Sequence, residues 1–260
     1  MKFDIFEYTS RGGRAVNEDC VDHRIFGDTA VLTVADGLGG HSLGEVASAV
    51  TVNTVLSSLE SALENFRPII EAPIVETQNS DGEKNLEKII EEAIEKANDA
   101  ILSIQQEKGQ VLKSTLAMLL VTPLNIVLAN VGDSRVYMLR QGEITEYTAD
   151  HSVAYKKYKA GEITREEIGF DEDQSALLRT LGSDDRHEPS IYNLNLVPQK
   201  GDAFLLCSDG FWEYVKDLEI EVDYAKSENA KEWALKLLTR AMDRVDGDND
   251  NITVLTVIVK

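Results

Sequence analysis

The chain has 260 residues, 43% of them hydrophobic and 28% charged, with two cysteines and a formal net charge of −20. This length and apolar content suffice for a sizeable core, whereas the acidic balance disfavours a nucleic-acid-binding protein, which needs a basic face. We find no apolar run of the roughly 18 residues that span a membrane and no signal-peptide pattern at the N-terminus. A soluble, cytoplasmic protein that binds neither nucleic acid nor membranes is therefore expected.

The first clear element is a predicted strand over residues 29–35, a β-branched run that ends at Asp36 and Gly37. Ser42 and Glu45 then form a capping box, the signature of a helix N-terminus. The spacing of the apolar residues that follow predicts a helix with one buried face.

A second predicted helix is more strongly amphipathic, with glutamate and lysine opposite one apolar stripe. The stripe consists of Leu86, Ile89, Ile90, Ala93, Ile94, Ala97, Ile101 and Ile104. Residues 66–85, between the two helices, contain Pro68, Pro73 and a polar stretch. We expect these residues to form a surface loop.

The second half begins with four short predicted strands, over 116–121, 126–131, 135–139 and 144–148. Turn residues separate them, which indicates an antiparallel meander. Residues 152–185 are charged and weakly periodic. The remaining elements are a buried strand over 204–207, a helix over 233–241 and a last strand over 252–259.

Aspartates recur where these predicted strands end or begin. Asp36 and Asp209 each follow a strand, and Asp250 precedes the last one. Each alone is most simply a turn residue, but three of them could converge on one sheet edge. Hard divalent cations prefer such oxygen ligands, and close carboxylates repel one another unless a cation lies among them. The pattern therefore indicates a candidate metal site.

Eight short motifs run in order along nearly the whole chain. They are RAVNED (14–19), DGLGGH (36–41), GEVAS (44–48), ANVGDSR (129–135), DHS (150–152), RTLG (179–182), SDGFW (208–212) and DNI (250–252). In this order they resemble the type 2C metal-dependent serine/threonine protein phosphatases in their compact bacterial form. The resemblance implies an α+β fold over 1–260 as a single domain: an αββα sandwich of two antiparallel sheets flanked by pairs of antiparallel helices.

The resemblance also implies a metal centre. The metal-binding positions of the family map onto Asp36, Asp209 and Asp250, with Asp36 bridging two Mn²⁺ or Mg²⁺ ions and the carbonyl of Gly37 as a further ligand. Asp133 matches a position of a third, weaker metal site that includes Asp209. The alternative for Asp133 is a turn between strands.

Further roles follow from the same resemblance. Arg14 is the candidate phosphate clamp, because a guanidinium can bind two phosphoryl oxygens at once. Glu18 would hold metal-bound water and Asp19 would orient the nucleophile, although an ordinary polar loop could also contain both. Asn251 would support the loop of Asp250 by hydrogen bonding.

The sequence departs from the family pattern at two places. Leu38 stands where some relatives carry a histidine proposed as a general acid, and His41 lies three residues further on, where it could reach the site or only pack against the helix start. Lys113 stands where the family often has glycine before a Ser/Thr-Thr pair, here Ser114-Thr115. Lys113 could alter the approach of a substrate without removing a ligand.

The expected activity is hydrolysis of phosphoserine and phosphothreonine in proteins by water activated between two cations. The expected partners are phosphorylated proteins, with a Ser/Thr kinase as the opposing enzyme, and we expect a monomer. Two alternatives stay open: a phosphatase of small phosphomonoesters, and a catalytically weak regulatory binding module. Residues 152–185 match the flap of the family, which we expect to select the protein substrate, unless they are a surface excursion without a role.

Overall fold

The computed structural model describes residues 1–39, 43–70 and 80–260, with the backbone alone for 64–70 and 80–85. The strands are β1 (Phe3–Ser10), β2 (Asp19–Phe26), β3 (Thr29–Gly39), β4 (Leu112–Ser114), β5 (Leu116–Val121), β6 (Ile126–Val131), β7 (Arg135–Arg140), β8 (Glu143–Tyr147), β9 (Ser190–Asn193), β10 (Ala203–Cys207) and β11 (Ile252–Val259). The helices are α1 (Gly44–Ile70), α2 (Ser80–Lys108), α3 (Val153–Ala160), α4 (Asp209–Trp212), α5 (Asp217–Ala225) and α6 (Ala230–Met242), with a short 3₁₀ helix, η1 (Arg165–Phe170).

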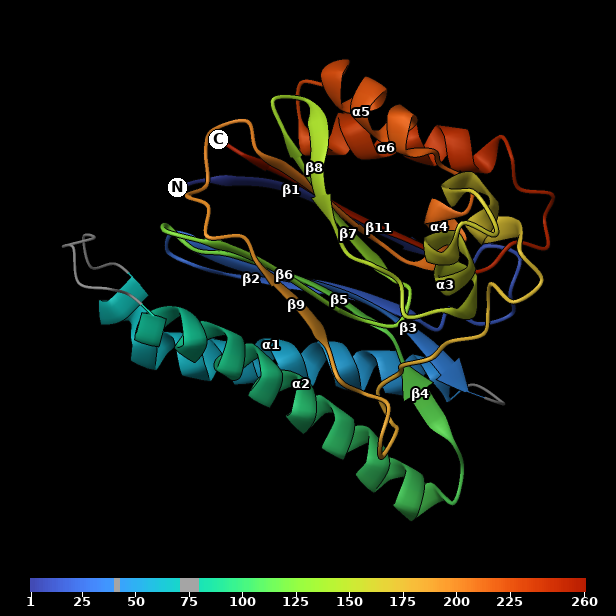
Figure 1. The fold of residues 1–260 in the computed structure, drawn as a ribbon, viewed down its shortest axis with the longest axis horizontal. Coiled ribbons are helices and arrows are strands. Elements are labelled where there is room, and N and C mark those ends of the chain that lie inside the picture. The colour runs from blue at the N-terminus through green and yellow to red at the C-terminus, as the bar shows by residue number, and fades with distance from the viewer. Residues whose placement is uncertain (40–42, 71–79) are drawn as a thin grey trace.

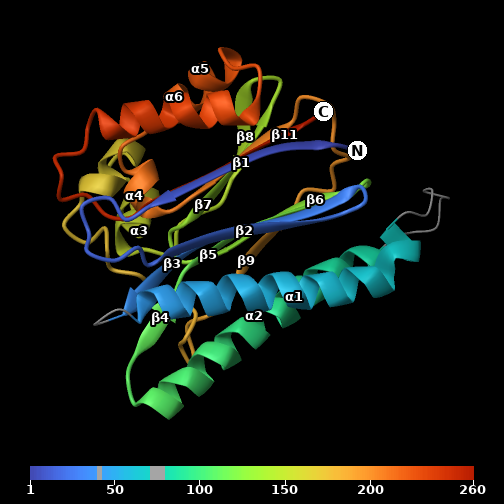
Figure 2. The ribbon, with the colours of Figure 1, turned by 180° about the vertical axis from the view of Figure 1, so that it is seen from behind.

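Two antiparallel sheets are stacked face to face between helices (Figure 1). One sheet has the strand order β1-β11-β10-β7-β8, and the other has the order β2-β3-β5-β6-β9, with β4 paired to the far end of β3. Helices α1 and α2 cover the second sheet, while α5 and α6 cover the first, as the reverse view also shows (Figure 2). The expected αββα sandwich is confirmed.

Three apolar layers hold this sandwich together. One lies between α1, α2 and the second sheet, one between the two sheets, and one beneath α5 and α6. In β3, Val31 and Ala35 face the helices, whereas Leu32 and Val34 face the other sheet, as the two-residue period of a strand requires. Because both faces of the central strands are covered, β5, β6, β10 and β11 are buried along their whole length.

The predicted meander is wrong in its connectivity, although its four strands are present. β5 pairs with β6 in the second sheet, and β7 pairs with β8 in the first. The chain therefore changes sheets at residues 132–134, where Gly132 has a φ of +94° that favours glycine. Alternating apolar residues cannot reveal which sheet a strand joins. The crossing brings Asp133 to the end of the sandwich.

The loop predicted over residues 66–85 is also wrong at both of its ends. α1 continues to Ile70 and α2 begins at Ser80, whereas residues 71–79 lie outside the described residues. Pro68 lacks a backbone N–H, but it lies only two residues before the end of α1. Ser42 of the predicted capping box also lies outside the described residues.

The stretch Gly44–Leu63 of α1 is long and apolar enough, by length and composition only, to cross a membrane, contrary to our reading of the sequence. In the structure 44% of this stretch is buried. Val55, Leu56 and Leu59 belong to the core between the helices and the second sheet. The apolar face of α1 is thereby used in folding.

Candidate metal and phosphate site

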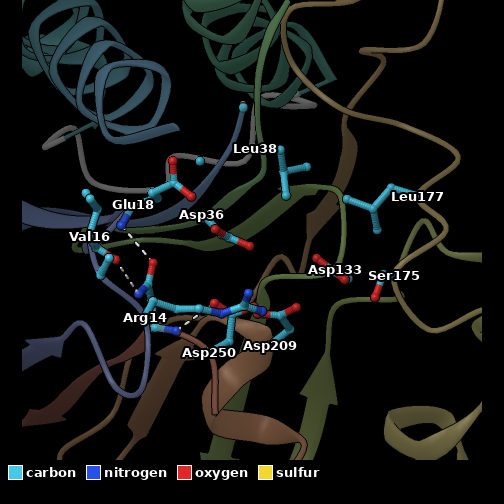
Figure 3. A pocket seen from close by; sticks show the side chains of 14 residues that line it. Arg14, Val16, Glu18, Asp36, Leu38, Asp133, Ser175, Leu177, Asp209 and Asp250 are labelled. Atoms are coloured by element: carbon cyan, nitrogen blue, oxygen red, sulfur yellow. Dashed lines mark hydrogen bonds and ion pairs between the residues drawn. The ribbon is translucent and has the colours of Figure 1, made fainter. Parts of the chain in front are cut away.

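A pocket opens at one end of the sandwich, where strands of both sheets terminate (Figure 3). It has a volume of about 500 Å³. Its lining consists of Arg14, Ala15, Val16, Glu18, Asp36, Gly37, Leu38, Gly39, Asp133, Ser175, Leu177, Asp209, Asp250 and Asn251. Most of the residues singled out from the sequence are thus brought together.

Four aspartates reach this pocket from four separate segments. Asp36 lies near the end of β3 in the second sheet, and Asp133 lies where the chain crosses between the sheets. Asp209 begins α4, two residues after the end of β10, and Asp250 lies two residues before β11, the strand beside β10. The carboxylates therefore meet across the ends of both sheets rather than at one sheet edge.

Burial and mutual repulsion raise the pKa of three of these carboxyl groups. For Asp36 and Asp133, burial is the larger cause and the charge of Asp209 the next; both pKa values lie well above the ordinary value. The pKa of Asp209 is raised to about 7 by burial and then by Asp250 and Asp19. The pocket thus concentrates negative charge that the fold itself penalises.

Arg14 is the basic residue of the lining, and its Nη2 lies 2.8 Å from Oδ2 of Asp250. Among the described residues, Asp36, Asp133 and Asp209 have no ion-pair partner, and no three acidic, histidine or cysteine side chains already form a compact cage. The pocket is thus lined by a set of carboxylates, here called the carboxylate ring, and Gly37 is part of the same lining. This donor set fits hard divalent cations, which would relieve the repulsion.

Hydrogen bonds hold Glu18 against the N-terminal end of α1. Its Oε1 accepts a hydrogen bond from the Gly44 N–H at 3.1 Å, and its backbone carbonyl accepts from the Ser48 hydroxyl at 2.5 Å and from the Gly37 N–H at 3.1 Å. Burial is the main cause of a raised pKa for its carboxyl group. Glu18 thus reaches the pocket from a fixed backbone.

Asp19 lies behind the lining, opposite Asp36 in the β2–β3 pair. It is 8% exposed, and its Oδ2 accepts a hydrogen bond from the Ser208 hydroxyl at 2.7 Å. Its Oδ1 is buried with no partner among the described residues. Burial raises the pKa of Asp19 to about 6. An orphaned buried carboxylate oxygen beside the ring is a further acceptor for a ligand.

The glycine at position 37 has a reason that the sequence did not reveal. A Cβ placed on Gly37 would lie 1.9 Å from the carbonyl oxygen of Gly44, and one on Gly44 would lie 2.5 Å from Oε1 of Glu18. The end of β3 and the start of α1 therefore pack backbone against backbone. The absence of a side chain at Gly37 is therefore required for this contact between segments.

Asn251 binds the loop of residues 11–18. Its Oδ1 accepts from the Glu18 N–H at 2.7 Å, and its Nδ2 donates to the carbonyls of Arg11 and Val16, both at 2.9 Å. The side chain is thus fully engaged at 4% residue exposure. This residue ties the segment of Arg14 and Glu18 to the start of β11.

Three further residues differ in how they relate to the pocket. Leu38 lines it, whereas His41 lies outside the described residues. Glu213 was not singled out from the sequence, yet its pKa is raised to about 8 by burial and by the charges of Asp209 and Asp250. Its spacing of four residues from Asp209, one helical turn, is the signal that could have found it.

The flap, residues 152–185, forms the wall of the pocket opposite Arg14 through Ser175 and Leu177 (Figure 3). Within the flap, Nζ of Lys157 lies 2.8 Å from carboxylate oxygens of both Asp171 and Asp173. This clamp joins α3 to the segment that leads to Ser175. The flap is an ordered part of the site.

Known proteins resemble this chain in sequence. A family model described as protein phosphatase 2C matches residues 9–246. The serine/threonine phosphatase Stp of Listeria monocytogenes is 31% identical over 230 residues, which cover 87% of this chain and 83% of that protein.

Two solved structures extend this likeness. A Streptococcus agalactiae serine/threonine phosphatase aligns over 100% of both chains with a TM-score of 0.80 and 26% identity. The catalytic domain of the phosphatase PstP, described as a complex with two manganese ions, covers 99% of both chains with a TM-score of 0.74 and 28% identity.

Proposed function

Because the chain belongs to the protein phosphatase 2C family and is a serine/threonine protein phosphatase, we propose that its catalytic centre is the carboxylate ring formed by Asp36, Asp209 and Asp250. The observation that carries this proposal is the meeting of three aspartates from separate strand ends in one pocket beside Arg14 and Glu18. The catalytic unit is proposed to be a single domain over residues 1–260.

The family is metal-dependent, and Asp36, Asp209, Asp250 and the carbonyl of Gly37 would hold two cations in this chain. Such cations lower the pKa of water and offset the charge of a phosphoryl group. Mn²⁺ and Mg²⁺ both suit these oxygen donors. Asp133 would contribute with Asp209 to a third, weaker site, because burial and then the nearby charge of Asp209 raise the pKa of Asp133.

The remaining residues of the site are proposed to bind the phosphoryl group, to orient water and to hold the loop of residues 11–18 in place. Arg14 would bind two phosphoryl oxygens through its guanidinium and thereby leave its contact with Asp250. Glu18 would hold a water molecule of the centre, and the buried carboxylate of Asp19 would orient the attacking water and accept its proton. Asn251 would keep the segment of Arg14 and Glu18 in register with Asp250.

The substrates are proposed to be phosphoproteins carrying phosphoserine or phosphothreonine, with a Ser/Thr kinase as the opposing enzyme. We further propose a cytoplasmic monomer, which size-exclusion chromatography and cell fractionation would test. A small-molecule phosphatase would have the same centre, so the distinction depends on the flap beside it. A weak binding module is disfavoured because every proposed metal carboxylate is present.

The test is a panel of phosphopeptides, sugar phosphates and nucleotides, assayed after chelation and again after addition of Mn²⁺ or Mg²⁺. We expect no turnover with chelator, recovery with either ion, and a higher kcat/KM for phosphopeptides than for the small phosphomonoesters. Full turnover in chelator would contradict the metal centre. A preference for sugar phosphates or nucleotides would contradict the substrate class while leaving the centre intact.

A further inference from the structure

The pair Ser114-Thr115, noted in the sequence but given no role so far, lies directly behind the carboxylate ring. Thr115 stands between β4 and β5, opposite Asp36. Both hydroxyl residues are completely buried. A buried hydroxyl is retained where its hydrogen bonds compensate for lost hydration, so the partners of Thr115 show what it holds.

The hydroxyl of Thr115 replaces a backbone acceptor at the last residues of β3. The Thr115 N–H donates to the Asp36 carbonyl at 2.8 Å, as in an ordinary antiparallel pair. The return bond differs, because the Asp36 N–H donates to Oγ1 of Thr115 at 2.9 Å. The Thr115 carbonyl instead accepts from the Ser114 hydroxyl at 2.8 Å. The peptide of Asp36 is therefore oriented by a side chain.

The same threonine contacts the segment of Asp133 on both sides of that residue. Its Oγ1 lies 2.7 Å from Oγ of Ser134. Its Cγ2 would lie 2.7 Å from a Cβ on Gly132, so glycine is needed there for a second reason besides its φ. Through these two contacts Thr115 bridges the second sheet and the crossing to the first.

We propose that Thr115, together with Ser134, is a positioning residue that fixes the Asp36 carboxylate relative to Asp133. The proposal rests on the metal centre proposed above. The Thr115 hydroxyl contacts the Asp36 N–H on one side and the Ser134 hydroxyl on the other, so it holds the two segments at hydrogen-bond distance. A cation then meets ligands that are already aligned.

The test measures Mn²⁺ binding calorimetrically to the chelated, full-length enzyme without substrate. Thr115→Val keeps the shape and removes the hydroxyl, whereas Thr115→Ser keeps the hydroxyl. Ser134→Ala removes the same contact from the other side and decides the matter if Thr115→Val does not fold. We expect Thr115→Val and Ser134→Ala to weaken Mn²⁺ binding about tenfold or more, and Thr115→Ser to restore most of the affinity.

Thr256→Val is the matched control. Thr256 lies in β11, away from the pocket, and its buried hydroxyl donates to the carbonyl of Ala230 in α6 at 2.9 Å. It should lower thermal stability without changing Mn²⁺ affinity. At saturating Mn²⁺, Thr115→Val should lower kcat for p-nitrophenyl phosphate while KM stays within about twofold, because Arg14 is untouched.

Asp36→Asn separates the two levels of failure. If Asp36→Asn binds Mn²⁺ like the wild type, the proposed centre is wrong and this inference falls with it. If Asp36→Asn loses binding while Thr115→Val and Ser134→Ala retain wild-type affinity, the inference alone is overturned. An equal loss in Thr256→Val would also overturn it, since the effect would then be general destabilisation.

Discussion

In the flap, Asp171 and Asp173 share the ammonium group of Lys157, with both oxygens 2.8 Å from Nζ. In the pocket, Asp36 and Asp133 face other carboxylates and have raised pKa values. The flap carboxylate of Asp171 shows the opposite shift, because its hydrogen bond from Lys157 lowers its pKa. The fold therefore supplies a cation to the two flap aspartates, whereas Asp36 and Asp133 have no ion-pair partner among the described residues.

Asp150 makes the comparison stricter, because it is as deeply buried as Asp133. The Asp150 carboxylate receives both Nε and Nη2 of Arg135, at 2.8 and 2.6 Å. The fold thus neutralises one buried aspartate with an arginine and leaves the other, two residues before that arginine in the chain, facing the pocket. A buried carboxylate that faces a pocket without an ion-pair partner is a candidate ligand for an external cation.

The largest expected effect is that of Asp36→Asn, which removes a charge from the uncompensated group. Turnover of p-nitrophenyl phosphate should fall by about three orders of magnitude or more, since the cations lose a ligand. The metal-free variant should melt at a higher temperature than the wild type, because repulsion is relieved. Steady-state kinetics and melting in chelator check both. Near-normal turnover would contradict the assignment.

Asp150, which Arg135 neutralises, should behave in the opposite way from Asp36: its substitution should lower stability rather than activity. Asp150→Asn leaves the guanidinium of Arg135 buried and without its carboxylate, which should cost about 3–5 kcal/mol of unfolding free energy. Urea unfolding measures this loss, and calorimetry should show Mn²⁺ affinity close to that of the wild type. A variant that kept its stability but lost Mn²⁺ would reverse the roles of the two aspartates.

Arg14 is the cation of the pocket itself, and its variants should have an intermediate effect. Arg14→Ala should raise KM for p-nitrophenyl phosphate about tenfold, and should lower kcat as well if the contact tightens in the transition state. Arg14→Lys should restore only part, because an ammonium group cannot bind two oxygens in a fixed fork. Unchanged kinetics for Arg14→Ala would remove this residue from the phosphate site.

The raised pKa values also predict how pH acts on the metal-free protein. Asp19 and Asp209 have pKa values of about 6 and about 7 in the folded state, against an ordinary value of 3.8. Between pH 4 and 7 the folded state therefore binds more protons than the unfolded state, so the free energy of unfolding falls as pH rises. The pKa of Glu219 is instead lowered from 4.5 to about 2, so this residue changes the free energy of unfolding only at pH values below this ordinary pKa.

We expect the melting temperature in chelator to fall by about 5 °C or more from pH 5 to pH 8. Saturating Mn²⁺ should remove this decline, because the cations compensate the ionised carboxylates. Melting curves with and without Mn²⁺ provide the measurement. A melting temperature that rises with pH in chelator would show that these carboxylates are not strained by their ionisation.

Much of the fold could be predicted because its signals are local. Strand periodicity and the strand-ending aspartates located Asp36, Asp209 and Asp250 in the chain. The sheet to which β7 belongs depends on packing between distant strands, so the crossing at Gly132 could not be read from alternation. The role of Asn251 was only partly predicted, because its partners lie in residues 11–18 at the other end of the chain.

The remainder of the site could not be predicted for the same reason. Ser175 and Leu177 come from a weakly periodic segment, and their place in the pocket depends on how the flap folds back. The family motifs pointed to Ser114-Thr115 without indicating a contact with Ser134, nineteen residues away. Side chains that act through another residue leave no spacing pattern of their own.

The smallest expected effect concerns the flap, and it separates charges that are free from charges that hold structure. Lys156 and Lys159 are exposed on α3, whereas Lys157 is engaged with Asp171 and Asp173. Lys156→Glu and Lys159→Glu should change kcat/KM for phosphopeptides about threefold to tenfold, with hydrolysis of p-nitrophenyl phosphate nearly constant. Lys157→Glu should instead lower turnover of both substrates, because loss of the clamp displaces the segment that leads to Ser175 and Leu177.

Lys226→Glu on the end of α5 is the matched charge reversal and should affect neither substrate. Parallel assays of the four variants on both substrates decide the matter: no change on phosphopeptides for Lys156→Glu and Lys159→Glu would leave the flap as a structural wall rather than a substrate-selecting surface.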